Sequence, residues 1–177
     1  MPKIYFISGV SGVGKSTNIT YLQKLLPASN FDIRDFDERG VPDGGGQEWH
    51  NKETRYWLDF AKRNAVMDKS TIVCGFINPE PFKLIYKIGD VPVQLILLDA
   101  KPETIKQRLL GRYPTKESEI EIERASGVSL EQFAADCARF APQLKTIFQK
   151  TPGALIIDTE NKNKEEVANK IIDCITF

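Results

Sequence analysis

Short apolar runs alternate along this chain with longer stretches in which apolar residues recur every three or four positions. The short runs predict β-strands, and the helical spacing between them predicts α-helices. Strands are expected at residues 3–8, 31–35, 70–76, 93–98 and 154–158. Helices are expected after the first strand and ending before Pro27, over about 47–68, 102–112, 129–148 and 165–175, and as a short element at 82–88.

This order of elements predicts the fold class. Strands that alternate with helices imply an α/β protein with a parallel sheet, right-handed crossovers and helices on both faces. The run at 70–76 is nearly continuous in apolar residues, as expected of a strand covered on both sides. In such a sheet the functional site lies at the carboxyl ends of the strands.

Two polar stretches interrupt the alternation. Residues 40–46 are rich in glycine and predict a surface loop of the kind that often contacts substrate. Residues 113–128 are charged and poor in apolar side chains, so we expect a helical flap or mobile loop that serves as a lid. After this stretch, Ser129 and Gln132 predict a capping box, and Pro142 should kink the following helix or end its first half.

Length and composition limit the possibilities further. A chain of 177 residues has room for one sizeable core, so we expect a single domain over 1–177 with the lid inserted at about 113–128. The 24 basic and 24 acidic side chains cancel, and no basic field indicates a nucleic acid partner. We expect a cytoplasmic monomer or homodimer without a membrane partner, because no apolar run could span a bilayer and no signal peptide precedes the first strand. The odd number of cysteines, far apart in the chain, indicates reduced core residues.

A glycine-rich loop directly follows the first strand. Its sequence is Gly9-Val10-Ser11-Gly12-Val13-Gly14-Lys15-Ser16-Thr17, which matches the phosphate-loop pattern between a strand and a helix. The glycines allow successive N–H groups to form a nest for phosphate oxygens at a helix N-terminus. Within that nest Lys15 could reach the outer phosphates, and the Ser16 hydroxyl could ligate Mg²⁺. The loop therefore predicts a nucleoside triphosphate with Mg²⁺, and the missing guanine motif and the family resemblance described below make ATP the expected nucleotide.

The motif alone leaves kinases, GTPases and motor ATPases open. A GTPase would be expected to recognise guanine through Asn-Lys-x-Asp, and the similar stretch Asn161-Lys162-Asn163-Lys164 lacks the aspartate. Motor ATPases carry an apolar strand that ends in Asp-Glu, and no expected strand here does so. A kinase needs an acceptor site, a group that orients the acceptor, and cations around the transferred phosphoryl group. The chain offers candidates for all three.

Three stretches carry a resemblance to a known group. They are the loop Gly9 to Thr17, the sequence Arg108-Leu109-Leu110-Gly111-Arg112, and Ile157-Asp158-Thr159 with the polar turn that follows. Together they resemble small P-loop kinases of the adenylate kinase, shikimate kinase and gluconate kinase kind. The resemblance implies a three-layer α/β/α fold with a five-stranded parallel sheet in the order 2-3-1-4-5.

The same resemblance implies roles for two arginines. Arg108 would stack on the base, beside Thr159, and Arg112 would reach the phosphates as a clamp on the transition state. Their spacing supports a shared role, because residues four apart lie on one face of a helix. The alternative is that both are solvated arginines beside acidic neighbours.

Two carboxylates end the second expected strand, in Ile33-Arg34-Asp35-Phe36-Asp37. This resembles the Asp-x-Asp of shikimate kinases, where such carboxylates serve the metal and the acceptor hydroxyl. We favour Asp35 for orienting the acceptor and either carboxylate for the metal, with Asp37 and Ser16 as the candidate ligands. The alternative is a pair of turn-forming aspartates with solvated side chains.

The remaining acceptor contacts are expected from Arg39, Arg55, Gly75 and Phe76. Adenylate kinases end their third strand in Asp-Gly-Phe-Pro-Arg, whereas this chain has Cys74-Gly75-Phe76-Ile77-Asn78-Pro79 there. It therefore lacks the arginine that holds a nucleoside monophosphate in that group. His50 is expected to be a surface side chain, and Trp49 and Trp57 to be packing residues.

The sequence hypothesis is a kinase that transfers a phosphoryl group from ATP to a small-molecule hydroxyl or phosphate. One alternative is a nucleoside monophosphate kinase with an unusual acceptor site. Another is an ATP-binding regulatory module that hydrolyses ATP slowly.

Overall fold

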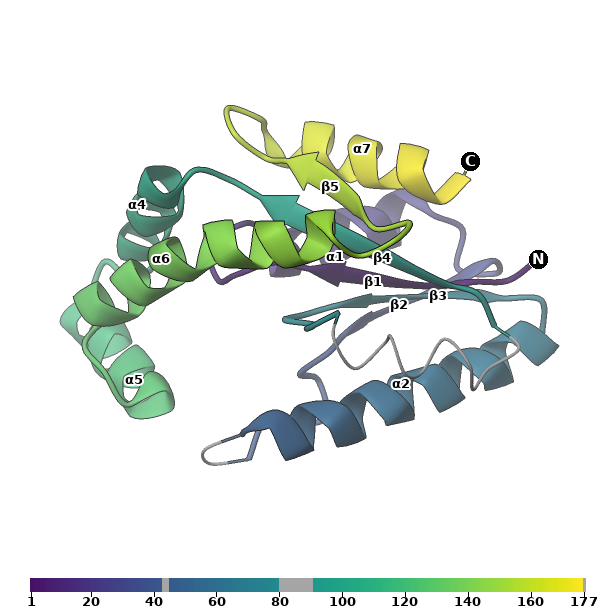
Figure 1. The fold of residues 1–177 in the computed structure, drawn as a ribbon, viewed down its shortest axis with the longest axis horizontal. Coiled ribbons are helices and arrows are strands. Elements are labelled where there is room, and N and C mark those ends of the chain that lie inside the picture. The colour runs from purple at the N-terminus through teal and green to yellow at the C-terminus, as the bar shows by residue number, and fades with distance from the viewer. Residues whose placement is uncertain (43–44, 80–90, 177) are drawn as a thin grey trace.

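The computed structural model describes residues 1–42, 45–79 and 91–176, with a sheet of five parallel strands at its centre (Figure 1). The strands are β1 (Ile4–Ser8), β2 (Phe31–Asp35), β3 (Ser70–Cys74), β4 (Val93–Asp99) and β5 (Leu155–Asp158). Their order is β2-β3-β1-β4-β5, so the expected fold class and strand order are confirmed.

Burial follows the position of each strand in the sheet. The central strand β1 pairs with β3 and β4, and all of its residues are buried. At the two edges, β2 buries Ile33 and β5 buries Ile157, while their other residues are half-buried or exposed. The inner strands are apolar along their length because helices cover both faces of the sheet.

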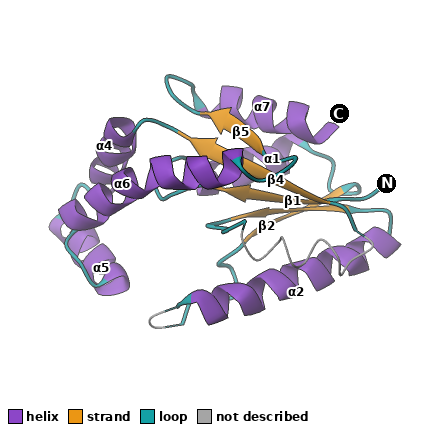
Figure 2. Ribbon diagram, viewed as in Figure 1, coloured by secondary structure: helices purple, strands orange, loops and turns teal. Residues whose placement is uncertain are grey.

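Helices form the other two layers. They are α1 (Lys15–Leu25), α2 (Gln47–Val66), α4 (Pro102–Arg112), α5 (Lys116–Ser126), α6 (Leu130–Gln149) and α7 (Lys164–Thr176). α1 and α7 pack together, whereas α2 packs on β3 and α6 packs on β4 and β5. Right-handed crossovers place these two groups on opposite faces, as the layers in Figure 2 show. α4 and α5 lie beyond the carboxyl ends of the strands, packed against α6 (Figure 1).

The α6 helix differs from its expected form. It runs without interruption from Leu130 to Gln149, so it does not end at Pro142. Ala138, Ala141 and Leu144 are buried around the proline, and this packing holds the helix together across the missing N–H. At its start, Ser129 accepts the backbone N–H of Gln132, but the Gln132 side chain bonds forward to Asp136. Only half of the expected capping box forms.

The charged stretch expected as a flap contains α5. Thr115 and Ser118 form a capping box at its start, and Gly127 ends it with a φ of 76°. No residue of α5 is buried. Its role as a lid stays a prediction. The short helix expected at 82–88 lies outside the described residues. None of the described helices is long and apolar enough to cross a membrane.

Candidate active site

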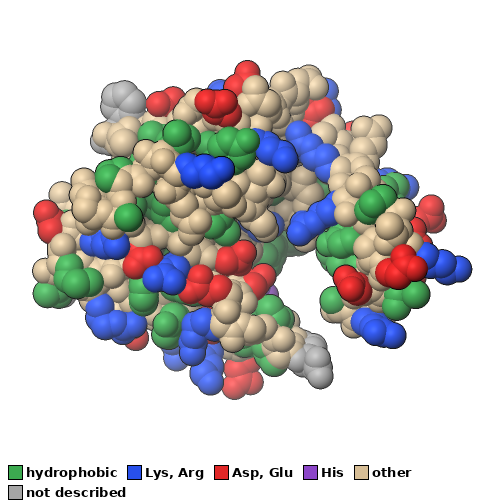
Figure 3. Space-filling model, turned by 180° about the vertical axis from the view of Figure 1, so that it is seen from behind, with side chains coloured by type: hydrophobic (Ala, Val, Ile, Leu, Met, Phe, Trp, Pro, Cys, Tyr) green, Lys and Arg blue, Asp and Glu red, His purple; other side chains and the backbone are tan. Residues whose placement is uncertain are grey.

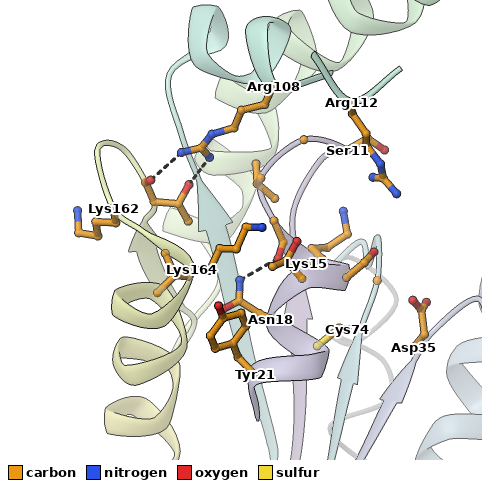
Figure 4. A pocket seen from close by; sticks show the side chains of 18 of the residues that line it. Ser11, Lys15, Asn18, Tyr21, Asp35, Cys74, Arg108, Arg112, Lys162 and Lys164 are labelled. Carbon is orange, nitrogen blue, oxygen red and sulfur yellow. Dashed lines mark hydrogen bonds between the residues drawn. The ribbon is translucent and has the colours of Figure 1, made fainter. Parts of the chain in front are cut away.

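A cavity of about 1000 Å³ opens at the carboxyl ends of the strands. Its walls come from the loop after β1, the first turns of α1, the ends of β2 and β3, α4, and the turn between β5 and α7. Figure 3 shows the molecule deeply hollowed between the end that carries α5 and the end that carries α2. In Figure 4, Lys15 lies between Arg108 on one side and Asp35 on the other. This is the position in which parallel α/β sheets bind ligands.

Glycines give the loop after β1 its shape. Gly12 and Gly14 have φ values of 91° and 100°, in the left-handed region that other residues rarely adopt. At Gly9 an added Cβ would lie 2.7 Å from the carbonyl oxygen of Leu98, because the loop passes directly against β4. Gly14 is also the N-cap of α1, so the loop ends on the unpaired N–H groups of a helix start. This backbone fits the phosphates of a nucleotide.

Lys15 is folded back over the loop that precedes it. Its Nζ donates to the carbonyl oxygens of Gly9 at 2.6 Å and Val10 at 3.0 Å. Burial lowers the Lys15 pKa to about 8, although the negative charge of Asp37 acts in the opposite direction. Bound phosphates would stabilise this poorly solvated ammonium. Ser16 also lines the cavity and is exposed, so its hydroxyl is open to a ligand.

Arg108 is fixed by the turn after β5. Its guanidinium donates to Thr159 Oγ1 at 3.0 Å and to the Thr159 carbonyl oxygen at 2.9 Å. Thr159 is tied to the end of β4, because its N–H and its hydroxyl both donate to the Asp99 carbonyl oxygen. The structure thus brings together the two residues expected beside the base, at one end of the cavity.

Arg112 lines the cavity one helical turn after Arg108. Figure 4 shows it near Ser11, apart from the contact between Arg108 and the β5–α7 turn. Its guanidinium carbon lies 5.6 Å from the ring centroid of Tyr113, and it forms no ion pair with any described residue. Arg112 is therefore available to an anion above the phosphate loop.

Two carboxylates stand on the other side of Lys15. Asp35 ends β2, and its Oδ1 accepts the Asp37 N–H at 3.0 Å, which closes the turn. Both side chains line the cavity, and neither pairs with a basic side chain among the described residues. Burial, with the adjacent charge of Asp35, raises the pKa of Asp37. The aspartates therefore form a turn and also present their side chains to the cavity.

These carboxylates could contribute to a metal site but would not complete one. Within the described residues, no group of three or more His, Cys, Asp and Glu side chains could hold a metal ion. Mg²⁺ commonly takes one or two carboxylates and completes its shell with waters and substrate phosphates. Ser16, Asp37 and the phosphates of a nucleotide would fit that kind of shell.

Of the four further residues expected to contact the acceptor, only Gly75 lines the cavity. Gly75 lines the cavity beside Asp35, and an added Cβ there would lie 2.2 Å from the Cβ of Phe36. Phe76 does not line it, and its ring packs instead against Phe140 at 6.0 Å between centroids.

The two arginines expected at the acceptor do not reach the cavity. Arg39 Nη1 lies 3.2 Å from the Glu53 carboxylate, and its guanidinium carbon lies 3.6 Å from the ring centroid of Tyr56. Glu53 is almost fully buried, so Arg39 is needed as its partner. Arg55 is exposed on α2.

His50 differs from the expected surface side chain. It is half-buried, and its ring stacks on Phe36 at 5.7 Å and meets Trp49 edge-on at 4.7 Å. Burial lowers the pKa of His50, while the nearby charge of Asp37 opposes this shift. The prediction that His50 is a surface side chain was wrong because α2 begins over the turn that follows β2, where Phe36 lies. The sequence gives no signal for this contact.

The sequence analysis missed several residues that line the cavity near Arg108 and Thr159, at the end where a nucleotide base is expected (the base end). They include Asn18, Tyr21, Lys162, Asn163 and Lys164. Asn18 is only 2% exposed, and its Nδ2 donates to the Gly14 carbonyl oxygen at 2.8 Å. Its Oδ1 has no hydrogen-bond partner among the described residues. Buried acceptors without a donor are rare, and an amino or hydroxyl group of a nucleotide would satisfy this one.

Cys137 was also missed as a neighbour of the phosphate loop. It lies on α6, half-buried and close enough to Ser11 of the phosphate loop for that residue to affect the pKa of its thiol. Burial raises the pKa of this thiol, and the contacts from Ser11 reduce the effect. No sequence signal links residues so far apart.

No protein-family model matches this sequence, and no curated protein matches it. Solved structures do match its fold. The tunicamycin resistance protein of Deinococcus radiodurans is 16% identical with a TM-score of 0.63, covering 99% of this chain and 96% of that one. The protein APE1195 is 18% identical with a TM-score of 0.62, over 99% and 95% of the two chains. Shikimate kinase from Acinetobacter baumannii, in complex with shikimate, is 17% identical with a TM-score of 0.56, over 99% and 93%. This chain therefore has the fold of the small P-loop kinases.

Proposed function

We propose that this protein is a kinase that transfers the γ-phosphoryl group of ATP to a small-molecule acceptor. One observation carries the proposal. A single cavity holds a phosphate loop, Arg112 above it, and Asp35 and Asp37 across from Arg108 and Thr159, and none of Arg112, Asp35 and Asp37 forms an ion pair with a described residue. A protein that only bound a nucleotide would need the first of these, whereas phosphoryl transfer needs all three.

The step assigned to these residues is a direct transfer. The acceptor oxygen forms a bond to the γ-phosphorus of ATP, the bond from that phosphorus to the β,γ-bridging oxygen breaks, and ADP leaves. Asp35 orients the acceptor hydroxyl and takes its proton, which then passes to solvent. Lys15 and Arg112 stabilise negative charge on the transferred group and on the leaving oxygen.

Mg²⁺, when bound, would neutralise charge on the β- and γ-phosphates. Ser16 and Asp37 are the residues proposed to hold it. Arg108, Thr159 and Asn18 are proposed to hold the base and ribose, since they line the opposite end of the cavity. ATP is proposed as the donor because the stretches that contain Arg108 and Thr159 resemble the adenine-binding region of the adenylate kinase group.

The test is acceptor-dependent formation of ADP. Purified protein with ATP and Mg²⁺ is incubated with pools of sugars, sugar acids, nucleosides, aromatic alcohols and nucleoside monophosphates. We expect one class of pool to raise ADP release in the wild type and not in Lys15→Ala. Tight ATP binding without any acceptor-dependent turnover would contradict the proposal and favour a regulatory ATP-binding module.

A second test concerns Asp35. We expect Asp35→Asn to lower kcat about 10²-fold or more while the KM for ATP changes little, because the amide cannot take the proton. Thermal unfolding should confirm that the turn after β2 survives, since an amide oxygen can still accept the Asp37 N–H. Turnover equal to wild type would remove Asp35 from the mechanism.

A further inference from the structure

The turn between β5 and α7 is tied to α4 at two points. At the first point Arg108 donates to the Thr159 hydroxyl at 3.0 Å and to the Thr159 carbonyl oxygen at 2.9 Å (Figure 4). At the second point the Glu160 carboxylate accepts the Thr104 hydroxyl at 2.7 Å and the backbone N–H of Lys101 at 3.2 Å. Thr104 and Arg108 are four residues apart, so both ties start from the same face of α4.

Glu160 is suited to this contact by its charge and its position. Hydrogen bonds from the Thr104 hydroxyl and the Lys101 N–H lower the pKa of Glu160, so the side chain is a carboxylate at neutral pH. Lys101 is the N-cap of α4, and negative charge is stabilised at a helix N-terminus. The Glu160 N–H donates to Asp158 Oδ1 at 2.8 Å, which fixes the backbone from which the side chain extends. The contact to α4 is therefore charge-assisted and stronger than one between neutral groups.

Glu160 does not itself line the cavity, whereas Thr159 and residues 162–164 of the same turn do. Its carboxylate bonds to α4, the helix that also brings Arg108 to the base end. Thr159 has a separate anchor, because its N–H and hydroxyl both donate to the Asp99 carbonyl oxygen at the end of β4. Glu160 therefore fixes the part of the turn that follows Thr159, which includes three lining residues.

We propose, resting on the nucleotide site of the kinase function above, that Glu160 is a positioning residue for the base and ribose of the nucleotide. It holds the turn against α4 before the nucleotide arrives, so that Arg108 and residues 162–164 keep fixed positions around the space assigned to the base. A site that is already ordered loses less conformational entropy when its ligand binds. Glu160 should therefore increase the affinity for a nucleotide, but not for a phosphate chain that only the loop after β1 would bind.

Two ligands separate the base and ribose from the phosphates. ATP and inorganic triphosphate, each with Mg²⁺, are titrated into the wild type and Glu160→Ala, with ATP followed by calorimetry and triphosphate by its displacement of ATP. We expect Glu160→Ala to raise the Kd for ATP about five- to twentyfold and to change the Kd for triphosphate by less than about twofold. Hydrogen exchange of the ligand-free proteins should be faster at residues 160–164 in the variant and unchanged at residues 9–17.

Three further variants isolate the contact. Glu103→Ala is the matched control, because Glu103 is an exposed acidic residue in the same first turn of α4. It removes the same charge from the helix N-terminus and leaves the bonds of Glu160 in place, so the Kd for ATP should change by less than about twofold. Thr104→Val removes one partner of Glu160, and Glu160→Gln keeps an oxygen for the Thr104 hydroxyl. Both should weaken ATP binding, and both by less than Glu160→Ala.

The other outcomes are distinct. Unchanged ATP affinity in Glu160→Ala, or equal weakening of ATP and triphosphate, would overturn the positioning role. A wild type that binds triphosphate as tightly as ATP would overturn the assignment of the base end, and this inference with it. Absence of ATP binding would overturn the kinase function as well. Because no acceptor is needed for these measurements, the kinase function can fail on turnover while the role of Glu160 in nucleotide binding stands.

Discussion

The two ends of the cavity are built in different ways. The phosphate end comes from one contiguous loop that includes Lys15, with Arg108 and Arg112 added from a single helix. The opposite end is assembled from two separate segments, with Asp35 and Asp37 at and just after the end of β2, and Cys74 and Gly75 at and just after the end of β3. The residues at the first end are thus mostly contiguous in the sequence, whereas those at the other end meet only in the folded protein. Substitutions at the two ends should therefore have different kinetic effects.

The largest effect is expected at the centre of the phosphate end. Lys15→Ala should lower kcat about 10³-fold or more, because the transferred group loses its buried cation. It should not lower the melting temperature, because the ammonium is poorly solvated in the fold and its removal relieves that cost. Lys24→Ala, at an exposed position of the same helix, is the control. A large loss of stability in Lys15→Ala would show that the lysine is structural.

The next effect separates the two arginines of α4. Arg112→Ala should lower kcat about 10²- to 10³-fold with a small change in ATP affinity, because the residue is proposed to act on the transition state. Arg108→Ala should chiefly weaken ATP binding, because it removes the proposed base contact and the two hydrogen bonds from α4 to the β5–α7 turn. ATP affinity is measured by calorimetry and turnover by ADP release. Equal losses of both quantities in Arg112→Ala would contradict its assigned role.

A pair of glycines compares packing at the end of the cavity opposite the phosphate loop with packing on α4. Gly75→Ala should lower the free energy of unfolding by about 2 to 3 kcal/mol, because the new Cβ collides with Phe36. Gly111→Ala should raise it by about 0.5 to 1 kcal/mol, because this exposed helical position has no atom within 4 Å of an added Cβ. Urea unfolding measures both. Similar stability of the two variants would show that the segment after β3 yields to the added methyl group.

The smallest effect concerns the thiol beside the phosphate loop. Burial raises the Cys137 pKa, so its alkylation by iodoacetamide should be slow near pH 7 and should accelerate about tenfold per pH unit below that pKa. ATP with Mg²⁺ should slow the labelling several-fold, because Ser11 contacts both the thiol and the cavity. Mass spectrometry should find Cys174, near the far end of α7, labelled at the same rate with and without ATP. Protection of Cys174 as well would indicate a global change instead.

Local patterns were enough to predict most of the fold. The strands matched their apolar runs because the inner strands are buried on both faces, which leaves a signal along the sequence. The end of α6 was harder to place, since Pro142 is a local signal that buried neighbours on both sides override. The missing half of the capping box has a different cause, because the exposed Gln132 side chain donates to Asp136 four residues later on the same helix.

The sequence by itself determined the parallel α/β fold and the phosphate loop, and it pointed to Arg108, Arg112, Asp35 and Asp37. Each of these depends on residues that are neighbours in the chain or lie at the end of a strand whose position the fold dictates. Only the tertiary structure decided that Arg39 pairs with Glu53 and that His50 packs against Phe36 and Trp49. Those outcomes depend on how α2 lies over the turn that follows β2, and contacts between distant segments leave no periodic signal in the sequence.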